Sequence, residues 1–237
     1  MFKQKFVITS IDVDTNFELK LSSLFKFMQE VASNHVESIS AGTFDLLKNN
    51  LLWVVIRADV KIYKTPKLND VITITTHPGE QKSFIFPRYF EIYDKKGELL
   101  ISSSGMWALI NKETRRVVIK PEGLKPLKVE KDKDDLPLPE KINGDASTLV
   151  DTRRVKYSEV DLNGHLNNTF YISYILDTHD LDFYRHNRVC SLSINYDKEI
   201  VFNEEVSLYS NKEDKEIIKG KVGDTNHFTA LIEYERR

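Results

Sequence analysis

Apolar and polar positions follow the same order twice along the chain. In each half, apolar residues fall at helical spacing, over 21–31 in the first half and 170–176 in the second. Strand-like runs bounded by turn-forming residues follow each helical pattern. The expected strands are 52–63, 71–76, 84–93 and 99–111 in the first half, and 189–196, 205–209, 216–222 and 228–235 in the second. A strand, a helix and several antiparallel strands, occurring twice, predict an α+β fold.

A short repeat supports this interpretation. Val13-Asp-Thr-Asn-Phe-Glu-Leu19 and Val160-Asp-Leu-Asn-Gly-His-Leu166 carry Val, Asp, Asn and Leu at the same places. The glycine and the histidine of the second copy are Phe and Glu in the first, so the turn itself does not require a histidine. We therefore expect a single working site in the second copy. The disfavoured alternative is a separate site in the first copy, built on Asp14, Asn16 and Glu18.

Pro, Lys, Asp and Gly are frequent between the two halves, and the apolar residues there are isolated. Such a composition is typical of a linker. We expect an N-terminal unit over 1–120, a linker over 121–148 and a C-terminal unit over 149–237.

Composition narrows the classes of function. The chain has 237 residues, of which 41% are apolar and 30% charged, and its net charge is −2. Without a basic block we expect no nucleic-acid partner, and without a run of about 18 apolar residues we expect no membrane span. Cys190 is the only cysteine, which excludes disulfide frameworks and zinc sites built on several thiolates. The N-terminus lacks the apolar run of a signal peptide, so we expect a cytoplasmic protein.

The densest polar cluster is the stretch from Asp161 to Asn168. A turn followed by a helix cap explains much of it, because Gly164 permits a positive φ and Asn167 or Asn168 can cap a helix. That structural interpretation does not explain His165. The cluster is therefore a candidate site for chemistry.

The segment from Tyr157 to Ile172 resembles the motif of acyl-ACP thioesterases of the hot-dog fold. The resemblance covers both halves and the linker. It implies two tandem hot-dog units, each a long helix wrapped by a curved antiparallel sheet. It also implies that the N-terminal unit shapes the acyl pocket and carries no catalytic set. Members of the family carry a Glu on the strand segment after the helix, and Glu199 stands at the matching place. The implied catalytic residues are Asp161, Asn163, His165 and Glu199.

Thioester hydrolysis by these residues needs an activated water. Glu199 is the candidate general base, provided that burial or a neighbouring carboxylate raises its pKa. Asp161 either couples to Glu199 or orients Asn163 and His165; which of those two holds the carbonyl stays open. Backbone N–H groups at the start of the second helix can stabilise the oxyanion. In plant members a Cys follows the Glu, but here that residue is Ile200, so water is the expected nucleophile and Cys190 a sheet thiol.

The resemblance also implies a partner, the acyl carrier protein (ACP) with its phosphopantetheine-linked acyl chain. Because ACP is acidic, it implies a basic docking patch, for which the candidates near the motif are Arg153, Arg154, Lys156, Arg185 and Arg188. No cofactor is expected. Nor is a metal ion, because the histidines lack metal-binding spacing, and we expect His179 and His186 at the surface. An acyl-CoA thioesterase on the same scaffold and a non-catalytic acyl-binding protein are the alternatives; a homodimer is left open.

Overall fold

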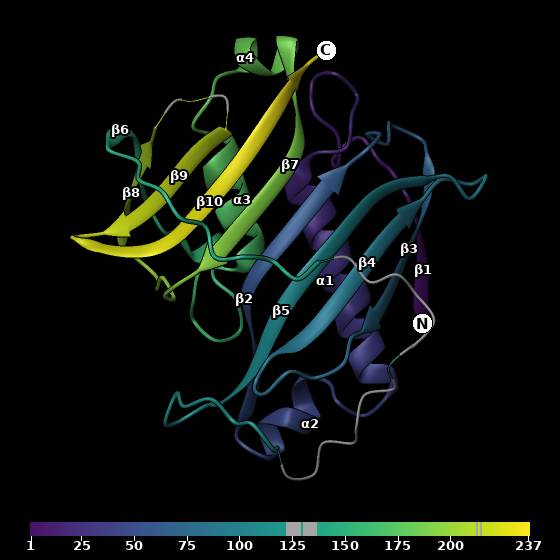
Figure 1. The fold of residues 1–237 in the computed structure, drawn as a ribbon, viewed down its shortest axis with the longest axis vertical. Helices are drawn as coiled ribbons and strands as arrows, with labels where there is room; N and C mark the ends of the chain where they lie inside the picture. The colour runs from purple at the N-terminus through teal and green to yellow at the C-terminus, as the bar shows by residue number, and fades with distance from the viewer. Residues whose placement is uncertain (122–128, 130–136, 212, 214) are drawn as a thin grey trace. The chain divides into compact units, whose positions relative to one another are not determined.

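The computed structural model describes residues 1–121, 129, 137–211, 213 and 215–237, which form two compact units (Figure 1). The first unit contains residues 1–19 and 26–139, and the second contains 20–25 and 140–237. The expected linker lies partly outside the described residues. Its described part from 137 to 147 forms neither helix nor strand.

The first unit contains an antiparallel sheet whose strands lie in the order β1-β3-β4-β5-β2. The last four strands follow the expected segments closely, because apolar and β-branched runs end there at turn residues. The strands are β1 (Phe2–Val7), β2 (Leu51–Ile62), β3 (Val71–Pro78), β4 (Phe86–Tyr93) and β5 (Leu99–Asn111).

The second unit repeats this topology with the order β6-β8-β9-β10-β7, again antiparallel. Each strand has a counterpart at the same place in the first unit, so the duplication read from the sequence extends to the fold. The strands are β6 (Thr148–Arg154), β7 (Asn187–Tyr196), β8 (Glu205–Ser210), β9 (Lys215–Val222) and β10 (Thr225–Arg236).

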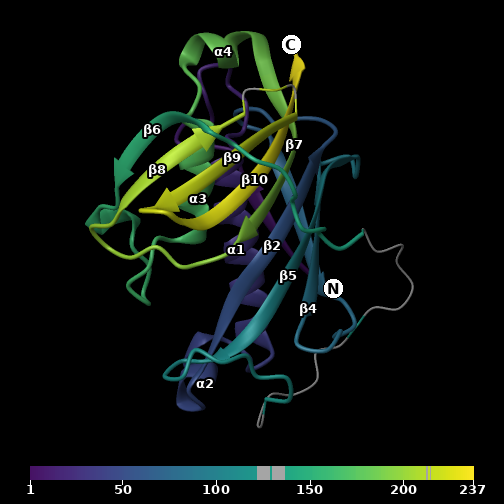
Figure 2. The ribbon, with the colours of Figure 1, turned by 60° about the vertical axis from the view of Figure 1, so that its left-hand side comes forward.

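One main helix belongs to each repeat. From residue 26 onward, α1 (Leu21–Ser38) belongs to the first unit, where it packs on β1 and Phe27 stacks on Phe6 with ring centroids 4.6 Å apart. In the second, α3 (Asn168–Leu176) sets Tyr171 edge-on against Phe228, and Figure 2 shows β8, β9 and β10 curving past it. This is the expected α+β, hot-dog arrangement, with nine residues in α3 against 18 in α1. Within the described part of the chain, no helix is long and apolar enough to cross a membrane.

Two short helices were not predicted. No helix was expected between 176 and 189, but α4 (Leu181–His186) forms there. Asp180 caps α4 by accepting the N–H of Phe183, whose ring packs edge-on against Tyr234. In the first unit, α2 (Thr43–Lys48) buries Leu46 in an apolar cluster with Leu51, Phe86 and Leu109. Both helices depend on partners distant in sequence, which the local pattern does not reveal.

Turn chemistry sets the strand ends as expected. In the turns at 68–70 and 202–204, Asn69 and Asn203 take positive φ values of 68° and 69°. Asparagine tolerates this conformation better than most residues. In the turn after β4, Gly97 has a φ of 86°, and the Asp94 carboxylate accepts the N–H groups of Lys96 and Glu98. Residues read from the sequence as turn formers therefore occupy the positions that require them.

Candidate functional site

The Asp161 carboxylate organises the turn that leads into α3. Its Oδ1 accepts the backbone N–H of Asn163 at 2.8 Å and that of His165 at 3.2 Å. The N–H of Asp161 donates to the carbonyl of His165 at 2.8 Å, and that of Gly164 donates to the carbonyl of Asp161 at 3.0 Å. Of the two roles left open for Asp161, these contacts are those of a residue that orients Asn163 and His165.

The first unit contains the same turn. Asp14 Oδ1 accepts the N–H of Asn16 at 2.8 Å and that of Glu18 at 3.1 Å. The N–H of Asp14 donates to the carbonyl of Glu18 at 2.8 Å, and that of Phe17 donates to the carbonyl of Asp14 at 3.1 Å. Even the positive φ is repeated, at 60° for Phe17 and 83° for Gly164. The turn therefore folds without a histidine, as the repeat predicted, and it also folds without a glycine.

The segment that carries Glu199 pairs with the turn of the second unit. His165 bridges Val201, and the N–H of Leu166 donates to the carbonyl of Ile200 at 2.7 Å. This pairing sets His165 Nε2 3.4 Å from Glu199 Oε2. The four candidate residues thus come from two segments that lie side by side in one unit.

The matching segment of the first unit shows what is specific to the second. There Glu18 bridges Lys67, and the N–H of Leu19 donates to the carbonyl of Pro66 at 2.8 Å. Thr65 therefore occupies the place of the second unit's glutamate. A backbone arrangement present twice carries an imidazole and a carboxylate side by side in the second copy, where the first copy has Glu and Thr.

Glu199 is less enclosed than the sequence argument required. Its side chain is 41% exposed, and that of His165 is 22% exposed. The neighbour at 3.4 Å is an imidazole and not a second carboxylate. Asn163 is exposed at the tip of the turn. The Glu199, His165 and Asn163 side chains are thus all reached by solvent.

His227 is a residue that sequence reasoning missed. Its ring Nδ1 lies 2.9 Å from the carbonyl oxygen of Glu199, and its own carbonyl accepts the N–H groups of Asp197 and Lys198 at 2.9 and 3.0 Å. Since a carbonyl oxygen only accepts, Nδ1 carries the proton. Burial lowers the pKa of His227, which keeps the ring neutral. His227 therefore fixes the backbone from which Glu199 projects, and a lone histidine in a strand gave no signal of this.

Asn167 caps α3. Its side-chain oxygen accepts the N–H of Thr169 at 3.0 Å, and its carbonyl accepts the N–H of Phe170 at 2.8 Å. One of the two expected capping residues is thus the cap. Two N–H groups of the first helical turn are already bonded to Asn167, so they are not available to an oxyanion. The start of α3 therefore has fewer N–H groups to stabilise an oxyanion than the sequence suggested.

We predict that Gly164→Ala lowers the free energy of unfolding by about 1 kcal/mol, because an L-residue is disfavoured at positive φ. A Cβ on Gly164 meets no atom within 4 Å, so only the backbone conformation is penalised. Chemical denaturation measures the change. Gly97→Ala is the matched control, since Gly97 has a φ of 86° and equally open space. A cost at Gly97 without one at Gly164 would contradict the prediction.

Cys190 lies on β7, where its thiol donates to the carbonyl of Glu233 at 3.4 Å. Burial, together with the nearby carboxylates of Glu235 and Glu233, raises the pKa of the thiol, the opposite of an activated nucleophile. We predict that Cys190→Ala retains the wild-type rate of thioester hydrolysis, measured as release of free thiol. A loss of tenfold or more would reinstate a cysteine mechanism.

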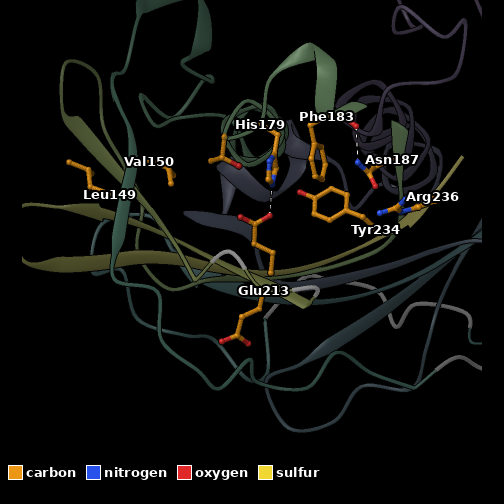
Figure 3. Close-up of a pocket in the computed structure, with 10 residues that line it drawn as sticks. Leu149, Val150, His179, Phe183, Asn187, Glu213, Tyr234 and Arg236 are labelled. Atoms are coloured by element: carbon orange, nitrogen blue, oxygen red, sulfur yellow. Dashed lines mark hydrogen bonds and ion pairs between the residues drawn. The ribbon is translucent and has the colours of Figure 1, made fainter. Parts of the chain in front are cut away.

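A hollow of about 860 Å³ lies elsewhere in the second unit (Figure 3). Its wall contains none of the four candidate residues; it is lined by Leu149, Val150, Thr178, His179, Phe183, Asn187, Glu213, Glu216, Tyr234 and Arg236. His179 Nε2 lies 2.6 Å from Glu216 Oε2, and the Glu216 side chain is 3% exposed. Burial alone raises the pKa of Glu216, but hydrogen bonds from His179 and Ser210 outweigh it and lower that pKa.

These contacts correct the expectation that His179 is a surface residue. The ring is held between the buried carboxylate and Phe183, on which it stacks at 3.8 Å. Figure 3 shows His179, Phe183 and Tyr234 lying close to one another in the wall of the hollow. His186 is exposed, as expected.

The arginines proposed as a basic docking patch carry acidic partners within the second unit. Arg153 contacts Asp151 at 2.6 Å and Asp177 at 2.7 Å. The other ion pairs are Arg154–Glu205 at 2.9 Å, Arg185–Asp182 at 3.5 Å and Arg188–Glu235 at 2.8 Å. Four of the five candidates are thus locally neutralised. The exception is Lys156, which has no acidic partner within 4.0 Å among the described residues.

Comparison with known families covers most of the chain. The family model described as "Acyl-ACP thioesterase N-terminal domain" matches residues 1–127, and that described as "Acyl-ACP thioesterase C-terminal domain" matches 143–233. A chloroplastic palmitoyl-acyl carrier protein thioesterase of Arabidopsis thaliana is 27% identical over 84% of this chain and 52% of its own length. A chloroplastic acyl-[acyl-carrier-protein] hydrolase of Cuphea viscosissima gives the same identity and coverage. The chain spans about half the length of these relatives.

Solved structures share the fold over the full chain. An acyl-ACP thioesterase from Bacteroides thetaiotaomicron superposes with a TM-score of 0.86 at 23% identity, covering 98% of this chain and 97% of its own. A 12:0-ACP thioesterase from Umbellularia californica gives a TM-score of 0.82 at 21% identity, covering 100% and 97%. At these identities the likeness establishes the arrangement of the elements.

Proposed function

The chain belongs to the acyl-ACP thioesterase family, and from that premise we propose that it hydrolyses acyl-ACP to a free fatty acid and ACP. The observation that carries the proposal is the side-by-side placement of His165 and Glu199 on a backbone arrangement that occurs twice. The first copy has Glu18 and Thr65 at those positions. The second copy therefore differs from the first in the two side chains that the proposed hydrolysis requires.

In the proposed reaction, Glu199 accepts a proton from a water molecule as the water oxygen adds to the thioester carbonyl carbon. The carbonyl π electrons move to oxygen and form a tetrahedral oxyanion. When the oxyanion collapses, the C–S bond breaks and its electron pair leaves on sulfur. The proton held by Glu199 then passes to the thiolate, and the products are the fatty acid and the free thiol. Such general-base assistance contributes about 10²–10⁴-fold to the rate.

The other three residues have supporting roles in this proposal. His165 faces Glu199 at 3.4 Å and can orient the water or polarise the carbonyl. Asn163 presents its amide at the exposed tip of the turn, where it can donate to the other of these two groups. Asp161 holds both residues through their backbone N–H groups and is a positioning residue. No step uses a cofactor or a metal ion.

Two other functions fit the same scaffold: an acyl-CoA thioesterase and a non-catalytic acyl-binding protein. The purified chain is tested with acyl-ACP and with acyl-CoA of matched chain length, and release of free thiol is measured with a thiol-reactive chromophore. We expect a higher kcat/KM for acyl-ACP. A preference for acyl-CoA would favour the first alternative, and binding without thiol release would favour the second.

Several expectations from the sequence stay predictions. These are the cytoplasmic location, the homodimer and the role of the N-terminal unit in shaping the acyl pocket. The boundaries 1–120, 121–148 and 149–237 likewise stay predictions.

A further inference from the structure

The residues from Glu199 to Val201, called the Glu199 segment below, are held in part by contacts that both copies share. Val201 donates its N–H to the Glu204 carboxylate at 2.9 Å. In the first copy Lys67 donates in the same way to Asp70 at 2.8 Å. These contacts, like the pairing of each segment with its turn, therefore belong to the duplicated scaffold.

His227 adds a contact from a β-bulge beside this segment. The register between β9 and β10 shifts between Asn226 and Phe228 and skips His227, and a bulge re-aims the side chain that it carries. His227 is buried, and its Nδ1–H donates to the carbonyl of Glu199 at 2.9 Å. The histidine thus bonds the backbone of the residue that carries the candidate base.

The first unit has the same bulge with a leucine in it. The register between β4 and β5 skips Leu100, which is also buried. Its carbonyl accepts the N–H groups of Tyr63 and Lys64 at 2.9 and 3.1 Å, just as the carbonyl of His227 accepts two N–H groups in the second unit. A leucine therefore fills this position while the bulge is kept, so the fold does not require the histidine.

Tyr171 meets the Glu199 segment from α3. Burial raises the pKa of Tyr171, and a hydrogen bond from the backbone N–H of Ile200 to its hydroxyl opposes that rise. Counted from the aligned turns, the equivalent residues of the first copy are Leu24, also buried, and Pro66, which has no N–H to donate. Both the donor and the acceptor of this hydrogen bond are thus specific to the second copy.

We propose that His227 and Tyr171 are positioning residues for the Glu199 segment. The inference rests on the proposed function, in which the Glu199 carboxylate is the general base. Catalytic groups have to be held within about 0.5 Å of their productive geometry. Because the Glu199 side chain is 41% exposed, it is packed on one side only, and the backbone has to supply that precision. Two buried polar side chains, at positions where the first copy has leucine, fix that backbone beside His165.

The test returns His227 to the leucine of the first unit. We expect His227→Leu to lower kcat for acyl-ACP hydrolysis about tenfold or more, because the Glu199 carbonyl loses its donor and the carboxylate shifts from the reacting water. KM should stay within about twofold of wild type, since the change acts on the base and not on substrate binding. The free energy of unfolding, measured by chemical denaturation, should not fall, because leucine fills the same bulge in the first unit.

His227→Asn is the conservative variant. The amide nitrogen of asparagine lies the same number of bonds from Cα as Nδ1 of histidine, so it can donate to the Glu199 carbonyl. This variant should recover most of the kcat that His227→Leu loses. Equal losses in the two variants would overturn the role of the hydrogen bond.

Tyr171→Phe tests the second positioning residue. It removes the hydroxyl and keeps the ring in its edge-on contact with Phe228, so kcat should fall with KM unchanged. Tyr174→Phe is the matched control, because Tyr174 is a buried tyrosine of the same helix whose hydroxyl donates to Glu159 at 2.9 Å. It should keep kcat within about twofold of wild type.

Hydrogen exchange of the Ile200 and Val201 backbone amides separates failure of this proposal from failure of the proposed function. Both amides should exchange faster in His227→Leu and in Tyr171→Phe than in wild type. Wild-type kcat in both variants of an active enzyme would overturn the positioning role. If wild type instead bound acyl-ACP and released no thiol, while the variants still exchanged faster, the proposed function would fail and the two residues would still hold the segment.

Discussion

Replacement of Glu199 by glutamine is expected to lower kcat for acyl thioester hydrolysis about 10²–10⁴-fold, the usual contribution of a general base. Glutamine keeps the shape of the side chain and its place beside His165, but its amide does not accept a proton from water. The loss should appear in kcat more than in KM, because the carboxylate acts on the water and not on the acyl chain. Release of free thiol under saturating substrate measures it.

The control for this variant is Glu205→Gln. Glu205 is an exposed carboxylate in the same unit, 57% exposed and ion-paired with Arg154, and it lies outside the four-residue set. We expect Glu205→Gln to keep the wild-type rate. An active Glu199→Gln enzyme would move the base to His165, whose Nε2 is the nearest titratable atom to that carboxylate within the set.

Much of the fold was predictable because its signals are local. Strand runs end at residues such as Asn69 and Asn203, which adopt the positive φ that the turns require. The repeat predicted that the same turn forms in both units, and the hydrogen bonds of Asp14 and Asp161 confirm this. These predictions came from the spacing of residues along the chain, and each predicted feature depends on contacts between neighbours within a few residues.

The predictions that failed depend on partners far apart in the sequence. His179 was expected at the surface, but Glu216, 37 residues away, holds its ring. The arginines named as candidates for a docking patch also have partners far along the chain, because Arg153 meets Asp177 across 24 residues and Arg154 meets Glu205 across 51. His227 supports Glu199 across 28 residues. Such pairs form when strands come together, and no local pattern marks them.

Asp161→Ala is expected to damage both stability and activity. The change removes a carboxylate that accepts two backbone N–H groups, which should lower the free energy of unfolding by about 1–2 kcal/mol. Without those bonds the turn no longer fixes Asn163 and His165. A displacement of about 1 Å at a reacting group can cost about 10²-fold in rate, so we expect a loss of that order in kcat. Denaturant unfolding and thiol release measure the two effects.

The duplicated turn provides a control that few proteins contain. Asp14→Ala removes the same two hydrogen bonds, to Asn16 and Glu18, from a turn without the histidine. It should therefore cost a similar free energy of unfolding and leave kcat within twofold of wild type. If both variants lost activity equally, the loss would follow from stability and Asp161 would have no positioning role. If neither lost activity, the turn would not position the site at all. A loss of activity confined to Asp161→Ala, at equal destabilisation, would show that the turn positions catalytic residues in the second unit and has only a structural role in the first.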